Sequence, residues 1–302
     1  MRKKNTAGFE RFQKKSNAAK KEEFRQEKRK WKKEREEFFE KKKAAANAPS
    51  VNRVQTITKL QRDNEWMPLN KYISNSGVCS RRDAAELVKQ GLVLVNGQKV
   101  TEPGHKVSEK DEVKVNGKKI RLAENSIYIL LNKPKDYLTT ADDPHQRKTV
   151  LDLIKVKERI FPVGRLDRNT SGVLLLTNDG ELSQKLTHPS HEVKKIYHVV
   201  LNKPLEKKDF DKILKGVKLD DGMATVDVLA YADLKDKTQI GLEIHSGRNR
   251  IVRRIFEKLG YDVKNLDRVM FAGLTKKNVD RGKWRYLSEK EIRNLKFFGK
   301  GK

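Results

Sequence analysis

The sequence contains little of what an exported or membrane protein needs. Among its 302 residues there is one cysteine, Cys79, which excludes a disulfide within the chain and a zinc site built from clustered cysteines. No apolar run approaches the roughly 20 residues of a membrane span, and the first residues lack the apolar segment of a secretory signal. We therefore expect a soluble protein of the reducing cytoplasm, with no membrane partner.

Negative charge is also scarce. The chain has 69 Lys and Arg against 41 Asp and Glu, a formal net charge of +28. So basic a chain predicts a polyanionic partner, but charge alone leaves ribosomal RNA, DNA, acidic protein and an anionic membrane surface as alternatives. The length indicates roughly two domains.

Residues 1–65 are expected to form a basic, low-complexity tail and linker. The first 48 residues hold 18 Lys and Arg and 8 Asp and Glu, a net of +10, with too few apolar side chains to bury a core. Phe24, Trp31 and Phe38 recur every seven residues, which would align aromatic groups along one helix face and suit RNA. A solvated, disordered tail with nonspecific affinity accounts for the same composition, and both interpretations stay open.

Residues 66–124 predict two short helices followed by hairpins. Pro68 can start the first helix, and Ser80 can cap the start of the second. The Asn-Gly pairs at 96–97 and 116–117 predict tight turns between strands. This pattern describes a small α/β domain.

The stretch PLNKYISNSGVCSRRDAAELVKQGLVLVNGQKV resembles the small RNA-binding domain of the ribosomal protein S-four type. The resemblance covers about fifty residues and implies that polar and basic side chains near the helix starts line an RNA-binding face. They are Lys71, Ser80, Arg81 and Arg82. Solvated surface charge on an ordinary small domain is the alternative interpretation.

Residues 125–302 alternate apolar, strand-like runs with helical patterns but show no regular strand-helix repeat. This favours an α+β domain around a mixed or antiparallel sheet over a doubly wound one. Strands are expected at 127–131, 173–176, 196–201 and 240–244, and helices at 206–215 and 248–259. The fold class is thus α+β, a small RNA-binding domain followed by a larger sheet domain.

The segment GRLDRNTSG, residues 164–172, joins two apolar runs. Its end glycines permit sharp turns, and Arg165 and Asp167 would point to the same side of an extended segment. A carboxylate flanked by Arg165 and Arg168 is expected to stay ionised and able to act as nucleophile or base. Considered alone, an Asp among Gly, Asn, Thr and Ser is more often a turn or cap residue.

Two further segments add cations and an aromatic ring. GRNRIVRR opens a helix with its apolar residues on one arc and Arg250, Arg253 and Arg254 on the other. The arginine fork suits phosphate and carboxylate groups, although a solvated basic face has the same pattern. In KKIYH, Tyr197 can stack on a base at the edge of a basic site, but a strand tyrosine is more often part of the core.

Together, GRLDRNTSGVLLLTNDG, KKIYHV and SGRNRIVRRIFEKLG resemble the motifs of the pseudouridine synthases that modify ribosomal RNA. The arrangement of an S-four-type domain before a catalytic domain is similar too, and the resemblance covers about residues 67–295. Within this family the chain most resembles the large-subunit, RluB-like type, and the small-subunit, RsuA-like type is the alternative. The implied activity is isomerisation of uridine to pseudouridine in ribosomal RNA, 23S rather than 16S.

The resemblance also implies roles for single residues. Asp167 matches the catalytic aspartate, Tyr197 the tyrosine that packs on the flipped base, and Arg253 the arginine that pairs with the aspartate. Arg165 matches the arginine that helps to extrude the uridine and fills its place. Weaker expectations of phosphate contact fall on Arg248, Arg250 and Lys133. Asp136 stands where the family usually has glycine, which leaves the turn geometry there open.

The implied reaction breaks the glycosidic bond at nitrogen 1 and joins carbon 5 to the ribose, so no cofactor or metal is expected. The sequence has no P-loop or dinucleotide fingerprint, and His188 and His191 lack a third ligand. We expect a monomer whose partner is ribosomal RNA or a ribosome-assembly intermediate. A noncatalytic assembly factor is the rival reading, but Asp167 would only repel phosphate in a pure binding cleft. Whether Asp167 attacks the sugar, attacks the base or removes a proton stays open.

Overall fold

A computed structural model describes Glu22, Gln26, Arg29, residues 66–123 and residues 125–297. The chain divides into two units, residues 1–65 and 66–302, and the second holds all of the strands described. The aromatic repeat predicted for the tail, Phe24, Trp31 and Phe38, lies outside the described residues, as does the linker. Within the described residues, no helix is long and apolar enough to cross a membrane.

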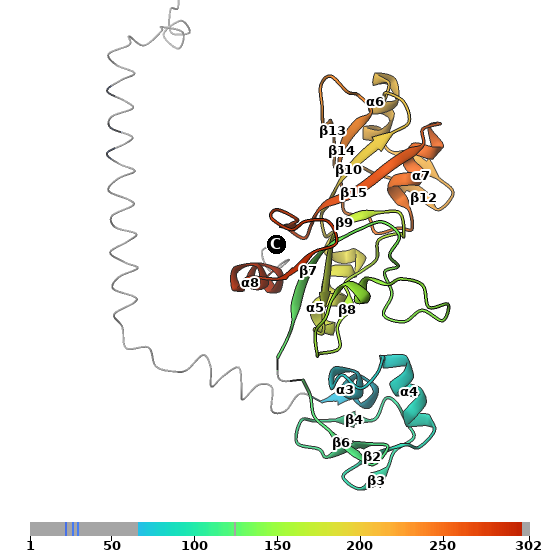
Figure 1. The fold of residues 1–302 in the computed structure, drawn as a ribbon, viewed down its shortest axis with the longest axis vertical. Coiled ribbons are helices and arrows are strands. Elements are labelled where there is room, and N and C mark those ends of the chain that lie inside the picture. Colours follow the sequence, from blue (N-terminus) through green and yellow to red (C-terminus); the bar gives the residue numbers. More distant parts are fainter. Residues whose placement is uncertain (1–21, 23–25, 27–28, 30–65, 124, 298–302) are drawn as a thin grey trace, which may run out of the picture. The chain divides into compact units, whose positions relative to one another are not determined.

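Residues 66–123 fold around two helices, α3 (Leu69–Asn75) and α4 (Arg81–Lys89) (Figure 1). They pack on a four-stranded sheet in the order β3-β2-β5-β6, through a core that includes Leu69, Ile73 and Val88. The strands are β2 (Val93–Val95), β3 (Gln98–Lys99), β5 (Val113–Val115) and β6 (Lys118–Ile120), and β1 (Met67–Pro68) pairs separately with β4 (Lys106–Val107).

The local sequence signals of this region are confirmed. Ser80 caps α4, since its hydroxyl accepts a bond from the Asp83 amide at 3.2 Å while the Asp83 carboxylate accepts one from the Ser80 amide at 3.3 Å. Both residues of each Asn-Gly turn have positive φ, at 51° and 81° for residues 96–97 and 49° and 76° for 116–117. These angles are those of the tight hairpin turns that the pairs predict.

Residues 125–297 form a larger sheet in the order β13-β14-β10-β15-β9-β7-β17, with β16 paired to β15 and β8 to β9 (Figure 1). Every described pair in it is antiparallel except β15 with β9. The α+β class and the mixed sheet are therefore confirmed. The strands are β7 (Tyr128–Lys133), β8 (Phe161–Pro162), β9 (Ser171–Thr177), β10 (Lys195–Leu201), β13 (Val228–Tyr231), β14 (Gln239–Ile244), β15 (Val263–Phe271), β16 (Leu274–Thr275) and β17 (Trp284–Tyr286).

Two hydrophobic clusters cover the sheet. One packs α6 (Lys207–Lys215) and α7 (Ile251–Lys258) against β10, β14 and β15, and the other packs α5 (Gly180–Thr187) and α8 (Glu289–Phe297) against β7 and β9. A small hairpin, β11 (Val217–Leu219) and β12 (Gly222–Ala224), lies beside α7. The predicted apolar arc of α7 is confirmed by four buried residues, Ile251, Val252, Ile255 and Phe256.

The parallel contact between β9 and β15 depends on Gly172. Its φ is +110°, and a Cβ added there would lie 2.1 Å from the Arg268 carbonyl oxygen and 2.6 Å from the Arg268 amide nitrogen. Because both atoms belong to the backbone, neither can yield, and only glycine lets the two strands approach this closely. The loop that ends at this glycine carries Asp167.

Candidate active site

A cavity of about 700 Å³ opens beside the β9 and β15 junction. Five of the residues predicted for the site line it: Arg165, Asp167, Tyr197, Arg248 and Arg250. They come from three segments far apart in sequence, and the fold gathers them around one space.

Asp167 lies in the loop between β8 and β9, half-buried between a buried Leu166 and an exposed Arg168. The Thr139 hydroxyl donates to the Leu166 carbonyl oxygen at 2.8 Å, and the Asp167 carbonyl oxygen accepts a bond from the Thr170 amide at 3.0 Å. These bonds fix the backbone of the loop and leave the Asp167 carboxylate facing the cavity.

Lys133 corrects the prediction of a phosphate contact. Its side chain is 0 % exposed, at the end of a strand buried along its whole length. The amino group lies 2.9 to 3.2 Å from the carbonyl oxygens of Pro134, Asp167, Arg168 and Thr170, and burial lowers its pKa to about 8. Lys133 thus holds the Asp167 loop through its backbone carbonyl groups.

The turn at Asp136 explains why glycine is usual there. Asp136 has a φ of 67°, in the left-handed region that Asp tolerates better than most residues, and its amide donates to the Arg168 carbonyl oxygen at 2.9 Å. The turn is therefore kept and gives the loop a second support.

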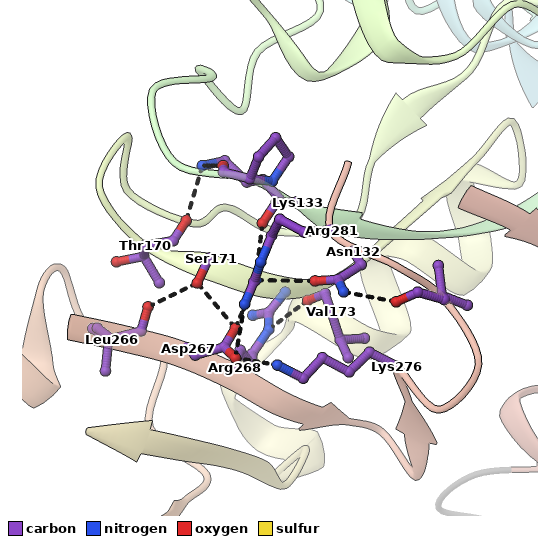
Figure 2. A network of polar contacts seen from close by, with 12 residues as sticks. Asn132, Lys133, Thr170, Ser171, Val173, Leu266, Asp267, Arg268, Lys276 and Arg281 are labelled. Atoms are coloured by element: carbon purple, nitrogen blue, oxygen red, sulfur yellow. Dashed lines mark hydrogen bonds and ion pairs between the residues drawn. The ribbon is translucent and has the colours of Figure 1, made fainter. Parts of the chain in front are cut away.

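A polar network around Asp267, which the motifs do not predict, joins the strand that follows the loop to its neighbours (Figure 2). The Asp267 carboxylate accepts bonds from Ser171 at 3.0 Å, from Arg281 at 3.0 and 3.2 Å, and from Lys276. Arg281 also donates to the Asn132 side-chain oxygen at 3.0 Å. Burial raises the pKa of Asp267, but the Arg281 and Lys276 bonds outweigh burial and hold this pKa below its usual range. The network joins β7, β9 and β15 behind the cavity.

Tyr197 and Arg268 form part of the cavity wall. Tyr197, on β10, is 8 % exposed and lies directly opposite Arg268 on β15. Arg268 is 3 % exposed and donates from Nε to the Val173 carbonyl oxygen at 2.8 Å, and burial lowers its pKa. Arg268 was not predicted as a site residue. The only hint in the sequence is that it is an arginine within an otherwise largely apolar strand.

Arg253 contacts the Asp167 loop through the backbone. Its guanidinium donates to the carbonyl oxygens of Val263 at 2.9 Å and Asn169 at 3.3 Å, so the predicted ion pair with the Asp167 carboxylate is not formed here. Burial, together with the Arg250 charge, lowers the pKa of Arg253, whereas the Asp167 carboxylate acts in the opposite direction. Arg253 thus binds the backbone of the Asp167 loop and not the Asp167 carboxylate.

The other arginines of the GRNRIVRR segment differ in how free they are. Arg248 donates to the Asp221 and Met223 carbonyl oxygens at 2.9 and 3.0 Å. Arg254 binds the Asp221 carboxylate at 2.6 and 2.9 Å. Arg250 is exposed and lies 3.3 Å from the Glu257 carboxylate, and because its φ is 48°, α7 begins only at Ile251. The Asp221 carboxylate therefore pairs with Arg248 and Arg254, two cations that the sequence suggested were available to phosphate.

Comparison with known proteins decides the family. Residues 127–258 match the model described as RNA pseudouridylate synthase, and residues 67–113 match the S4 domain. The chain is 42% identical over 232 residues to ribosomal large subunit pseudouridine synthase B of Bacillus subtilis, which covers 76% of this chain and 95% of that protein. The chain belongs to the pseudouridine synthase family.

Two further relatives agree with this assignment. The dual-specificity RNA pseudouridine synthase RluF of Escherichia coli K12 is 35% identical over 229 residues, 75% of this chain and 77% of that protein. A crystal structure of a pseudouridylate synthase superposes with a TM-score of 0.55 at 28% identity, over 76% of this chain and 99% of that one.

In this pseudouridine synthase the predicted residues of the S4 domain lie apart from the cavity lining. Arg81 and Arg82 are exposed at the start of α4, where Ser80 serves as the cap. The Lys71 amino group lies 2.7 Å from the Glu181 carboxylate, so part of its charge is compensated. Arg81 and Arg82 are the more available cations for an RNA backbone.

Proposed function

We propose that this protein isomerises uridine to pseudouridine in ribosomal RNA of the large subunit, with residues 66–124 as the RNA-binding domain and 125–302 as the catalytic domain. The observation that carries the proposal is a single carboxylate, Asp167, in a cavity whose other charged lining residues are the cations Arg165, Lys195, Arg248, Arg250 and Arg268. These cations suit an RNA strand, whereas a carboxylate among them serves chemistry better than binding. The Bacillus subtilis relative, named for the large subunit, favours that RNA as substrate.

Three residues of the cavity lining, Arg165, Tyr197 and Asp167, have a direct part in the proposed reaction. The target uridine leaves its stack and enters the cavity, and the exposed Arg165 at the rim fills the vacancy. Tyr197 packs on the flipped base, and Asp167 supplies the reacting oxygen as nucleophile or base. Arg253 and Lys133 hold the loop that presents Asp167, through the carbonyl oxygens of Asn169 and of Asp167 itself.

The protein acts in the cytoplasm as a monomer, on ribosomal RNA or an assembly intermediate. The exposed Arg81 and Arg82 of the S4 domain contact RNA phosphates, as Arg250 does beside the cavity. These contacts fix the position of the RNA without reading its sequence.

The test is to map pseudouridine in ribosomal RNA from cells that lack this protein, then restore it as wild type, Asp167→Asn or Asp233→Asn. Asp167→Asn removes the reacting anion at nearly constant size, so we expect it to leave one large-subunit pseudouridine missing. Asp233 is an exposed carboxylate outside the cavity lining, and its variant should restore the modification as wild type does.

Restoration by Asp167→Asn would remove that residue from the chemistry. A missing pseudouridine in the small subunit would correct the substrate. If every pseudouridine persisted in the deletion strain, and no second synthase covered the site, a noncatalytic assembly factor would replace the proposal.

A further inference from the structure

The floor of the cavity holds two cations with no part in the proposed reaction. Lys195 and Tyr197, two residues apart on β10, share one face of the strand. β15 places Phe271 opposite Lys195 and Arg268 opposite Tyr197. All four residues line the cavity, so the tyrosine proposed to receive the base has one cation next to it along β10 and another across from it on β15.

Arg268 keeps a donor unused. Its Nε binds the Val173 carbonyl oxygen at 2.8 Å and its guanidinium lies 4.6 Å from the Phe271 ring centre, which fixes the side chain. Its Nη2 is shielded from solvent and has no partner in the part of the chain that the structure describes. A buried donor without an acceptor is unfavourable, so an oxygen supplied by a ligand would be bound strongly.

Lys195 also has a hydrogen-bond donor without a partner among the described residues. Its amino group donates to the carbonyl oxygens of Val193 at 2.7 Å and His245 at 2.6 Å, and no third partner is found among the described residues. Burial lowers its pKa to about 8 and the Arg268 charge adds to that effect, whereas Asp227 opposes it. Two mutually repelling cations with spare donors favour a ligand that carries negative charge.

We propose that Arg268 and Lys195 form a donor site that binds a carbonyl oxygen of the flipped uracil. The assignment rests on the proposed function. Arg268 is buried and Lys195 is half-buried, so a base that has left its stack can reach them, whereas phosphates remain near exposed Arg165 and Arg250. No bond to either side chain forms or breaks. The two cations stabilise negative charge on uracil once its glycosidic bond is cleaved.

The same chemistry selects the base. Arginine and lysine only donate hydrogen bonds, so the site accepts the carbonyl oxygen that uracil carries at carbon 4 and disfavours the amino group that cytosine carries there. Arg268 and Lys195 thereby become specificity residues of this synthase.

The test compares Arg268→Met, Arg268→Lys and Lys195→Met in the full chain, with an unmodified ribosomal RNA transcript in single-turnover assays. We expect Arg268→Met to lower the rate about 100-fold, as loss of one donor to a developing anion does elsewhere. Arg268→Lys should recover part of this loss, and Lys195→Met should show a smaller one. RNA affinity and its salt dependence should not change. Arg285→Met is the matched control, because that guanidinium pairs with Glu291 outside the cavity lining.

A wild-type rate in folded Arg268→Met would overturn the assignment. So would a salt slope of RNA binding lower by about one, because that change reports a lost phosphate contact. Tyr197 is the neighbour of Arg268 across the two strands, and it opposes the effect of burial on the pKa of Arg268. If the effect of Arg268→Met vanished in a Tyr197→Phe background, Arg268 would act through Tyr197 and the substrate contact would be refuted.

Two further outcomes concern the folding of Arg268→Met and the activity of the wild type. If Arg268→Met lost cooperative thermal unfolding, Arg268→Lys and Lys195→Met would decide by the same criteria. If the wild type formed no pseudouridine, the proposed function itself would fail and this site would fail with it.

Discussion

The buried amino group of Lys133 makes the stability of the protein depend on pH. Its pKa in the folded chain is about 8 against 10.5 for an ordinary lysine, so between these values the unfolded chain holds a proton that the folded chain has released. The free energy of unfolding therefore rises with pH across this window, and the stabilisation is lost as pH falls through the folded pKa.

We expect Lys133→Met to flatten that rise by on the order of 1 kcal/mol, measured by urea unfolding at about pH 7.5 and about pH 9.5. Lys195 titrates with the same sign, so part of the slope should persist in the variant. An unchanged slope would mean that the Lys133 amino group stays charged in the folded chain.

Arg253 is expected to act on the rate through the position of the Asp167 loop. Arg253→Ala removes the bond to the Asn169 carbonyl oxygen, and a displacement of about 1 Å in a reacting group costs roughly 100-fold in rate. Single-turnover assays at saturating RNA, with a melting curve to establish folding, measure this effect. A rate within a factor of about two of wild type would show that Lys133 and the Asp136 turn hold the loop alone.

At the level of single residues, the site residues that belong to motifs could be predicted from the sequence. The role of a residue that depends on its burial in the fold could not. Asp167, Tyr197 and Arg165 were identified from two motifs, and the fold brings them to one cavity. Lys133 was expected to contact phosphate. Here β7 is buried along its whole length, and the nearby carbonyl groups need a donor.

The hairpin of β11 and β12 places the Asp221 carboxylate against Arg254 of α7 and against Arg248, which precedes that helix. The bond from Arg254 holds the pKa of Asp221 below its usual range, so this carboxylate is ionised at neutral pH and opposes RNA binding. Asp221→Asn should strengthen RNA binding and steepen its salt slope by about one, because Arg254 becomes available to phosphate.

Filter binding over a salt series measures this change, with Asp233→Asn as a control of equal charge change. If both variants raised affinity equally, the effect would belong to overall charge rather than to the hairpin.

Elements were predicted well where the chain is periodic and less well at their ends. The apolar runs gave β7, β9, β10 and β14 nearly in full. Helix α7 was expected from Arg248 and begins at Ile251, because Arg250 adopts a left-handed conformation that periodicity does not reveal. The order of the strands was beyond the sequence, since it depends on contacts between segments far apart in the chain.

The positive charge is unevenly distributed over the chain, so RNA binding and the rate of the reaction can be changed separately. Deleting residues 1–48 removes a net +10 of the +28 charge and retains residues 66–297, which hold the sheets and the cavity. We expect weaker RNA binding with a shallower salt slope, and an unchanged single-turnover rate at saturating RNA. A slower rate at saturation would give the tail a direct part in the reaction.

The parallel pairing of β9 with β15 also sets the order in which the enzyme acquires its activity. Ser171 and Asp267, which face each other there, are 96 residues apart, so the chain must close a long loop before the two parts of the sheet join. Asp167 precedes one of these strands and Arg268 lies on the other. A folding chain can thus complete most of its local hairpins and helices and still be inert, and catalytic competence should return only with the slowest phase of refolding.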